Sequence, residues 1–143
     1  MPSARVFPAW DDDPMALTLE QARAVFDRRR RAWLAGDVDA YLDCWVDDLV
    51  LETPGRVVRG RGDYEAMVRG SFGWAAPRTF EVHHLAVDGD VVLADWTITV
   101  DRRHDGTPVT WRGMSACELA DERIVWWREY YQDPVGLARA ARG

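Results

Sequence analysis

The chain has 143 residues, 48% of them hydrophobic and 29% charged, a composition typical of one globular domain with a single core. Its formal net charge of −6 argues against a nucleic-acid-binding module. No apolar run approaches the roughly 20 residues of a membrane span, and the N-terminus lacks the apolar core of a signal peptide, so we expect a cytoplasmic protein with neither a membrane nor a nucleic acid as partner.

The first half of the chain is predicted to be largely helical. Residues 1–17 show no regular pattern and are interpreted as a loose arm before the folded domain, which spans residues 18–135. Thr18 and Gln21 fit a capping box, which predicts a helix from there to about Ala35. Three further elements are expected next: a short helix over 37–46, a short strand over 50–53 and a third helix over 62–71.

The second half is predicted to be an antiparallel meander. Asp88-Gly89 is a hairpin turn signal, and two more turn signals follow at 104–106 and 120–122. The turns separate four predicted strands: 79–87, 91–101, 109–119 and 123–133. Residues 136–143 are expected to form a short basic tail. Helices followed by a meander predict an α+β fold: a cone-shaped curved antiparallel sheet with three N-terminal helices packed on its concave face, enclosing a pocket.

The last predicted strand carries a carboxylate between aromatic rings. Alternate residues share a face of a strand, which places Trp127, Glu129 and Tyr131 together on one side. The opposite face is also apolar, so the strand is expected to be covered on both sides. A carboxylate in that setting needs a partner, or it takes up a proton. Glu129 is therefore the first candidate for acid–base catalysis.

The first predicted helix places an arginine on its apolar face. Ala22, Val25, Phe26 and Trp33 form a stripe at helical spacing, and Arg29 falls within it. A guanidinium that points inward stays charged and needs a carboxylate or an anionic ligand. Two interpretations follow. This arginine either assists the carboxylate of the last strand in catalysis, or it forms a buried ion pair with that carboxylate.

Several other side chains are expected to face the pocket. We predict that the following large apolar, small or hydroxyl-bearing residues bind the substrate: Thr53, Trp96, Ile98, Trp111, Ser115, Cys117, Trp127 and Tyr131. His83 and His84 are adjacent in a strand, so only one is expected to face the pocket, and His84 is taken as the candidate with a catalytic role. The histidine spacing suits no common metal site. Cys44 and Cys117 also lack metal-ligand spacing and are expected to be reduced thiols.

From about Ala22 to Pro134, the chain resembles the SnoaL-like branch of the nuclear transport factor 2-like superfamily. The matching stretches are Ala35-Gly36-Asp37, Trp45-Val-Asp-Asp48, Leu51-Glu-Thr-Pro54, the ten residues His84–Leu93 and the closing segment 121–133. The resemblance implies a cone-shaped α+β fold. It does not fix the activity, because the superfamily includes polyketide cyclases, ketosteroid isomerases, epoxide hydrolases, dehydratases and plain binding domains.

The catalytic sets of two relatives can be compared with this chain. The tyrosine and two aspartates of ketosteroid isomerase fall on Arg29, Thr53 and Ser115, so steroid isomerisation by that mechanism is not expected. Limonene epoxide hydrolase has an Asp-Arg-Asp set. One aspartate falls on Glu129, but the other two members fall on Trp96 and Ile98, which cannot replace them. The polyketide cyclase branch uses a single acid–base residue in an apolar pocket and resembles this chain best.

The leading hypothesis is a cofactor-free enzyme of the SnoaL-like type. Its ligand would be a small apolar or polycyclic oxygenated molecule, as in secondary metabolism. Proton transfer by Glu129 would drive cyclisation, isomerisation, dehydration or hydrolysis. The alternative is a non-catalytic small-molecule binding domain, in which Arg29 and Glu129 form a buried ion pair. An ion-paired glutamate would have a lowered pKa, whereas a catalytic one would have a raised pKa.

The outward face of the predicted sheet carries apolar side chains as well. Met114, Trp126 and Tyr130 would leave an apolar patch exposed unless something covers it. We therefore expect a homodimer through this face, with charged contacts from Arg112, Glu118 and Arg128. The 18 basic residues are all arginines, and the chain contains no lysine or asparagine, which suggests a GC-rich bacterial genome.

Overall fold

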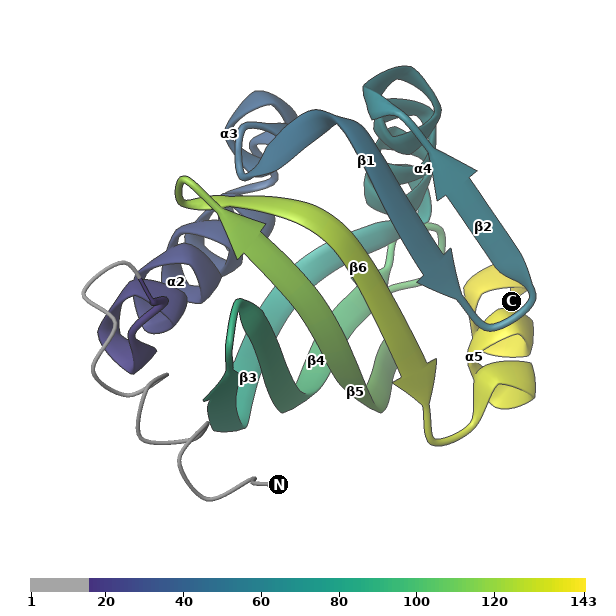
Figure 1. The fold of residues 1–143 in the computed structure, drawn as a ribbon. Coiled ribbons are helices and arrows are strands. Elements are labelled where there is room, and N and C mark those ends of the chain that lie inside the picture. Colours follow the sequence, from purple (N-terminus) through teal and green to yellow (C-terminus); the bar gives the residue numbers. More distant parts are fainter. Residues whose placement is uncertain (1–15) are drawn as a thin grey trace.

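A computed structural model describes residues 16–143 (Figure 1). Most of the predicted arm, residues 1–15, lies outside the described part. The elements in chain order are α2 (Leu19–Ala35), α3 (Val38–Leu42), β1 (Trp45–Thr53), β2 (Arg56–Arg59), α4 (Arg61–Trp74), β3 (Ala75–Asp88), β4 (Val91–Arg102), β5 (Pro108–Ala120), β6 (Arg123–Tyr131) and α5 (Pro134–Arg142). None of the described helices is long and apolar enough to cross a membrane.

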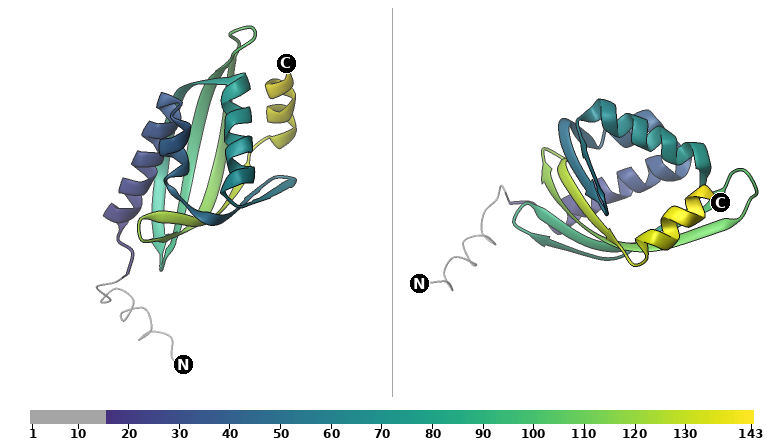
Figure 2. Two further views of the ribbon diagram at one scale, coloured as in Figure 1. Left: turned by 90° about the horizontal axis from the view of Figure 1, so that it is seen from above. Right: turned by 90° about the vertical axis from the view of Figure 1, so that its right-hand side faces the viewer.

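The structure is the expected α+β cone. Six strands form one curved sheet in the order β2-β1-β6-β5-β4-β3, and α2, α3 and α4 lie on its concave side (Figure 2). The predicted capping box is present, because the Thr18 hydroxyl accepts from the Gln21 backbone N–H at 3.0 Å and the Gln21 side chain accepts from the Thr18 N–H at 2.9 Å. The first helix ends where expected, at Gly36 with a φ of 67°.

The sheet differs from the prediction in one pairing and one strand. Strand β1 pairs with β6 in parallel, with Leu51 opposite Trp127, so the sheet is not wholly antiparallel. Strand β2 was missed; it forms a hairpin with β1 across the Pro54-Gly55 turn. Turn signals report only pairings between consecutive strands, so they could not indicate the contact between the first long strand and the last.

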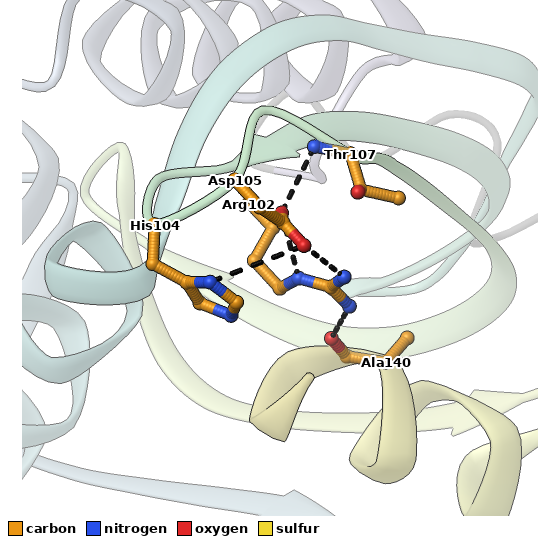
Figure 3. A network of polar contacts seen from close by, with 5 residues as sticks. All are labelled: Arg102, His104, Asp105, Thr107 and Ala140. Atoms are coloured by element: carbon orange, nitrogen blue, oxygen red, sulfur yellow. Dashed lines mark hydrogen bonds and ion pairs between the residues drawn. The ribbon is translucent and has the colours of Figure 1, made fainter.

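The predicted basic tail is the helix α5. Asp133 caps it by accepting from the Gly136 N–H at 2.9 Å, and Pro134 occupies its first turn. Arg102 holds this helix to the β4–β5 turn (Figure 3). Its Nη1 donates to the Ala140 carbonyl at 2.8 Å, while Nε and Nη2 donate to Asp105 at 3.0 and 2.5 Å. The Arg102 guanidinium holds the pKa of Asp105 well below its ordinary value.

Within residues 16–143, the fully buried tryptophans of the core are Trp45, Trp96 and Trp127. The packing of Trp96 requires a glycine on the neighbouring strand. Gly113 on β5 lies opposite Trp96 on β4, and a Cβ at position 113 would lie 2.5 Å from Trp96 Cη2 and 2.8 Å from the Tyr130 carbonyl oxygen. A methyl group cannot fit at those distances, so Trp96 and its strand must shift.

Gly113→Ala is therefore expected to lower the free energy of unfolding by about 1–3 kcal/mol, the usual range for overpacking a core. Urea unfolding measures this loss. Gly70→Ala is the matched control. Gly70 is exposed in α4 and a Cβ there meets nothing within 4 Å, so alanine should leave stability unchanged or raise it by up to about 1 kcal/mol. A Gly113→Ala variant as stable as wild type would contradict the packing described here.

Candidate active site

A cavity of about 90 Å³ lies between the helices and the concave face of the sheet. That volume holds several water molecules. Most of its wall is apolar or aromatic, and two charged residues line it. The lining residues are Arg29, Trp33, Tyr41, Leu51, Thr53, Tyr64, Met67, Val68, Ser71, Phe80, Trp96, Ile98, Trp111, Glu129 and Tyr131.

Glu129 projects from β6 into this cavity and is half-buried. Its Oε1 accepts a hydrogen bond from Trp127 Nε1 at 2.6 Å. Burial raises the pKa of Glu129 above its ordinary value. Hydrogen bonds from Tyr131 and Trp127 and the positive charge of Arg29 lower it, but they do not offset the burial. The raised pKa is the direction that suits an acid–base catalyst.

Arg29 is buried on the cavity side of α2, with 5% of its surface exposed. Its Cζ lies 4.2 Å from the Trp127 ring centroid and 5.2 Å from that of Phe80. Its Nε donates to the Tyr41 hydroxyl at 3.1 Å, and its Nη1 is buried without a hydrogen-bond partner in the described chain. Burial disfavours the charged guanidinium, but the tyrosine oxygens and Glu129 outweigh that effect, so the pKa of Arg29 is raised and the side chain stays cationic.

The Arg29–Glu129 ion pair, the second of the two interpretations, is not formed. None of the ion pairs among residues 16–143 joins these two side chains. Trp127 contacts both instead: its ring face packs against the guanidinium, and its indole N–H binds the carboxylate. A cation and a carboxylate therefore line one cavity without neutralising each other directly.

Two tyrosines, Tyr41 and Tyr64, lie beside Arg29 at one end of the cavity, which we call the arginine end. The Tyr64 hydroxyl lies 3.2 Å from the Tyr41 hydroxyl, which also accepts from Arg29. Burial, followed by the neighbouring Tyr41, raises the pKa of Tyr64 well above its ordinary value, so it remains protonated. Tyr64 was not among the predicted site residues. The signal was available, because Tyr64, Met67 and Val68 occupy one face of α4 at helical spacing.

Five of the eight predicted substrate-binding residues line the cavity: Thr53, Trp96, Ile98, Trp111 and Tyr131. Trp127 is buried just behind the wall and acts through its contacts with Arg29 and Glu129. Ser115 and Cys117 are buried in the sheet and are not lining residues. Ser115 accepts from Trp96 Nε1 at 3.1 Å, and burial raises the pKa of the Cys117 thiol to about 12, so this cysteine is not a thiolate nucleophile.

His84 does not face the cavity. Its side chain is 85% exposed and its Nδ1 lies 2.9 Å from Asp95 Oδ1 on the outer side of the sheet. His83 also lies outside, 2.7 Å from the Thr97 hydroxyl. The strand has a register shift between Val82 and His84, so strict alternation fails there and both histidines point outward. The expectation that one of the two faces the pocket was wrong for that reason.

An apolar-walled cavity under a curved sheet, with one half-buried carboxylate, is the arrangement expected of a small-molecule site. The chain belongs to the SnoaL-like domain family, whose model matches residues 22–127. A comparison with curated proteins gives no significant match.

Solved structures with the same fold include an isomerase candidate from Bacillus subtilis. Its TM-score is 0.77 at 19% identity, covering 87% of this chain and 94% of that one. An LEH-like epoxide hydrolase of M. tuberculosis has a TM-score of 0.70 at 25% identity, covering 84% and 91%. A polyketide cyclase candidate from Xanthomonas campestris has a TM-score of 0.70 at 18% identity, covering 83% and 96%. These similarities are spread over several activities, so the activity has to be argued from the site.

Proposed function

We propose that the protein is a cofactor-free enzyme that transfers protons on a small, largely apolar, oxygenated molecule, with Glu129 as the acid–base residue. One observation carries the proposal. The Glu129 carboxyl lies in an aromatic-walled cavity, has a raised pKa and is held by Trp127 without a direct ion pair. Enzymes raise carboxyl pKa values towards neutrality by such burial, because proton transfer is most effective there.

The reaction begins with removal of a proton from a carbon next to a carbonyl group. Glu129 takes the proton, and the electron pair of the C–H bond moves onto the carbonyl oxygen to form an enolate. Return of the proton to another carbon completes an isomerisation. Attack of the enolate on a second carbonyl of the same molecule, followed by return of the proton from Glu129 to the new alkoxide, gives cyclisation. Expulsion of a β-hydroxyl, protonated by Glu129 and lost as water, gives dehydration. Orientation in the cavity supplies part of the rate enhancement.

Epoxide hydrolysis is a weaker candidate, although one similar structure is an LEH-like epoxide hydrolase. The Asp-Arg-Asp set of limonene epoxide hydrolase has one counterpart here, Glu129. Trp96 and Ile98 stand at the other two positions, and both are apolar parts of the cavity wall. Neither can activate water or protonate an epoxide oxygen. The alternative of a non-catalytic binding domain included an Arg29–Glu129 ion pair, which is not among the ion pairs of residues 16–143.

The proposal is tested by deuterium exchange, which does not require the natural substrate. The protein is incubated in D₂O with small apolar ketones such as 2-tetralone and ethyl acetoacetate, and deuterium incorporation next to the carbonyl is followed by NMR against a protein-free control. Incorporation above background that depends on Glu129 is expected. Exchange no faster than in the protein-free control across the panel, or exchange that survives removal of the carboxylate, would contradict the proposal.

We also propose that a second copy of the chain covers the outer face of the sheet. Met114 and Tyr130 are 58% and 59% exposed there, which is unusual for large apolar side chains. Arg128 packs over Trp126 on the same face, with its Cζ 4.9 Å from the ring centroid. Light scattering at micromolar concentration is expected to give twice the monomer mass, and Met114→Glu should restore the monomer. A monomeric wild-type protein would count against this proposal.

A further inference from the structure

Hydrogen-bond donors gather at one end of the cavity. Arg29 makes one side-chain hydrogen bond within residues 16–143, from Nε to the Tyr41 hydroxyl. Its Nη1 is one of three buried side-chain polar atoms in the described chain that lack a partner. The other two are the Nε1 atoms of Trp33 and Trp45, and Trp33 also lines the cavity. Each of the three is an N–H donor, so this region is short of acceptors.

The two tyrosines add another donor. Tyr41 and Tyr64 together hold two phenolic protons, but only one can lie in the bond between their oxygens. The Tyr41 oxygen also accepts from Arg29 Nε. Whichever tyrosine donates to the other, one O–H is left with no acceptor given by the described residues. A ligand oxygen in the cavity would supply that acceptor.

The guanidinium of Arg29, at the same end of the cavity, also has no direct ion-pair partner among residues 16–143. The guanidinium is surrounded by the rings of Tyr41, Phe80 and Trp127, at 5.4, 5.2 and 4.2 Å from Cζ to the ring centroids. Ring faces attract a cation, but they do not neutralise it. A buried charge without a directly paired counterion is costly. Such a cost is tolerated where a ligand provides the missing charge.

We propose that Arg29, with the free tyrosine hydroxyl, binds a carboxylate of the substrate, so that the substrates are small apolar carboxylic acids. This inference rests on the proposed function, since it names the substrate class of the same site. The two oxygens of a carboxylate match the planar fork of a guanidinium, and the negative charge neutralises it. A neutral carbonyl oxygen could accept hydrogen bonds from the same donors, but it would leave the charge in place. The apolar body of the molecule would lie against Trp96, Trp111 and Ile98, towards Glu129.

The test compares charged and neutral probes of the same shape. Benzoate and benzamide form one pair, acetate and acetamide a smaller pair in case the cavity admits only small molecules. Binding is followed by NMR shifts of the tryptophan indole N–H groups, which separate the cavity from the surface. At least one carboxylate is expected to bind roughly 10–100-fold more tightly than its amide, the range of hydrogen bonds to a charged group.

Two variants test whether Arg29 causes the preference for the carboxylate. Arg29→Met should abolish the preference for the carboxylate. Arg31→Met should keep it, because Arg31 is exposed on the same helix and pairs with Asp27. A preference that persists in Arg29→Met, amides that bind as tightly as carboxylates, or the absence of cavity shifts with all four probes would overturn the inference. The wild-type comparison decides the question even if the variant fails to fold.

Failure of this inference is distinguishable from failure of the proposed function. The probe experiment measures binding and needs no turnover, whereas the exchange experiment measures proton transfer on neutral ketones. If Arg29 binds carboxylates but no exchange depends on Glu129, the carboxylate-binding site is supported and the proposed enzyme function is contradicted. If exchange depends on Glu129 but carboxylates bind no more tightly than amides, the enzyme function is supported and carboxylic acids are contradicted as the substrate class.

Discussion

Replacement of Glu129 by glutamine is expected to slow proton transfer by about 10²–10⁴-fold, the usual contribution of general acid–base catalysis. Glutamine keeps the shape of the side chain, and its amide oxygen can still accept from Trp127 Nε1, the bond that is 2.6 Å long in the wild type. The variant should therefore fold normally and keep the cavity. It loses only the ability to take up and return a proton, so the loss appears in the rate of deuterium exchange.

The chain offers a matched control for this substitution on the opposite face of the sheet. There Trp126 Nε1 donates to Glu118 Oε1 at 3.0 Å, so the same pair of side chains makes the same bond outside the cavity. Glu118→Gln should exchange deuterium at the wild-type rate. Equal losses in Glu118→Gln and Glu129→Gln would mean that the rate reports stability of the sheet rather than chemistry.

Replacement of Arg29 by methionine is expected to stabilise the folded protein by about 1–4 kcal/mol at pH 7. Replacing buried charged groups by apolar side chains of similar volume is often neutral or stabilising by this amount, and Arg29 has no direct ion-pair partner whose charge would be left behind unpaired. Arg29 is 5% exposed, has no ion-pair partner in the described chain and has an Nη1 without any hydrogen bond. Methionine fills the same space between the rings of Phe80 and Trp127.

Denaturant unfolding of Arg29→Met and the exposed control Arg31→Met measures this effect. The control should change stability by less than about 0.5 kcal/mol, as surface substitutions usually do. A loss of about 3–5 kcal/mol in Arg29→Met would show instead that the arginine compensates a buried carboxylate. That result would restore the ion-paired binding domain as the better interpretation. If Arg29→Met is more stable than wild type but no longer binds ligand, then Arg29 lowers stability and serves function, as functional residues often do.

The sequence predicted the cone fold and the two charged residues of its cavity for clear physical reasons. Arg29 interrupts an apolar helical stripe, and Glu129 alternates with aromatic residues along a strand, so periodicity placed both inside. The contacts between these two side chains could not be predicted from sequence periodicity. Periodicity gives a direction for each side chain, but it does not give the distance between two of them, and the intervening indole of Trp127 could not be foreseen.

The remaining errors have local causes. His84 was placed wrongly because a register shift in β3 changes the alternation that the prediction assumed. The parallel pairing of β1 with β6 joins segments far apart in the sequence, which turn signals cannot report. Tyr64 is an uncharged residue on the apolar face of α4, so its sequence position resembles that of an ordinary core residue, although its hydroxyl hydrogen-bonds to the tyrosine that accepts from Arg29.

The central claim is that Glu129 is a proton carrier and not half of an ion pair. A ¹³C NMR titration of the Glu129 side-chain carboxyl, with Glu129→Gln to assign the resonance, tests it most directly. The account predicts a pKa above the ordinary glutamate value, because burial outweighs the lowering by Tyr131, Arg29 and Trp127. It also predicts a further rise in Arg29→Met, where the positive charge is gone. A pKa below the ordinary value in the wild type would contradict the account.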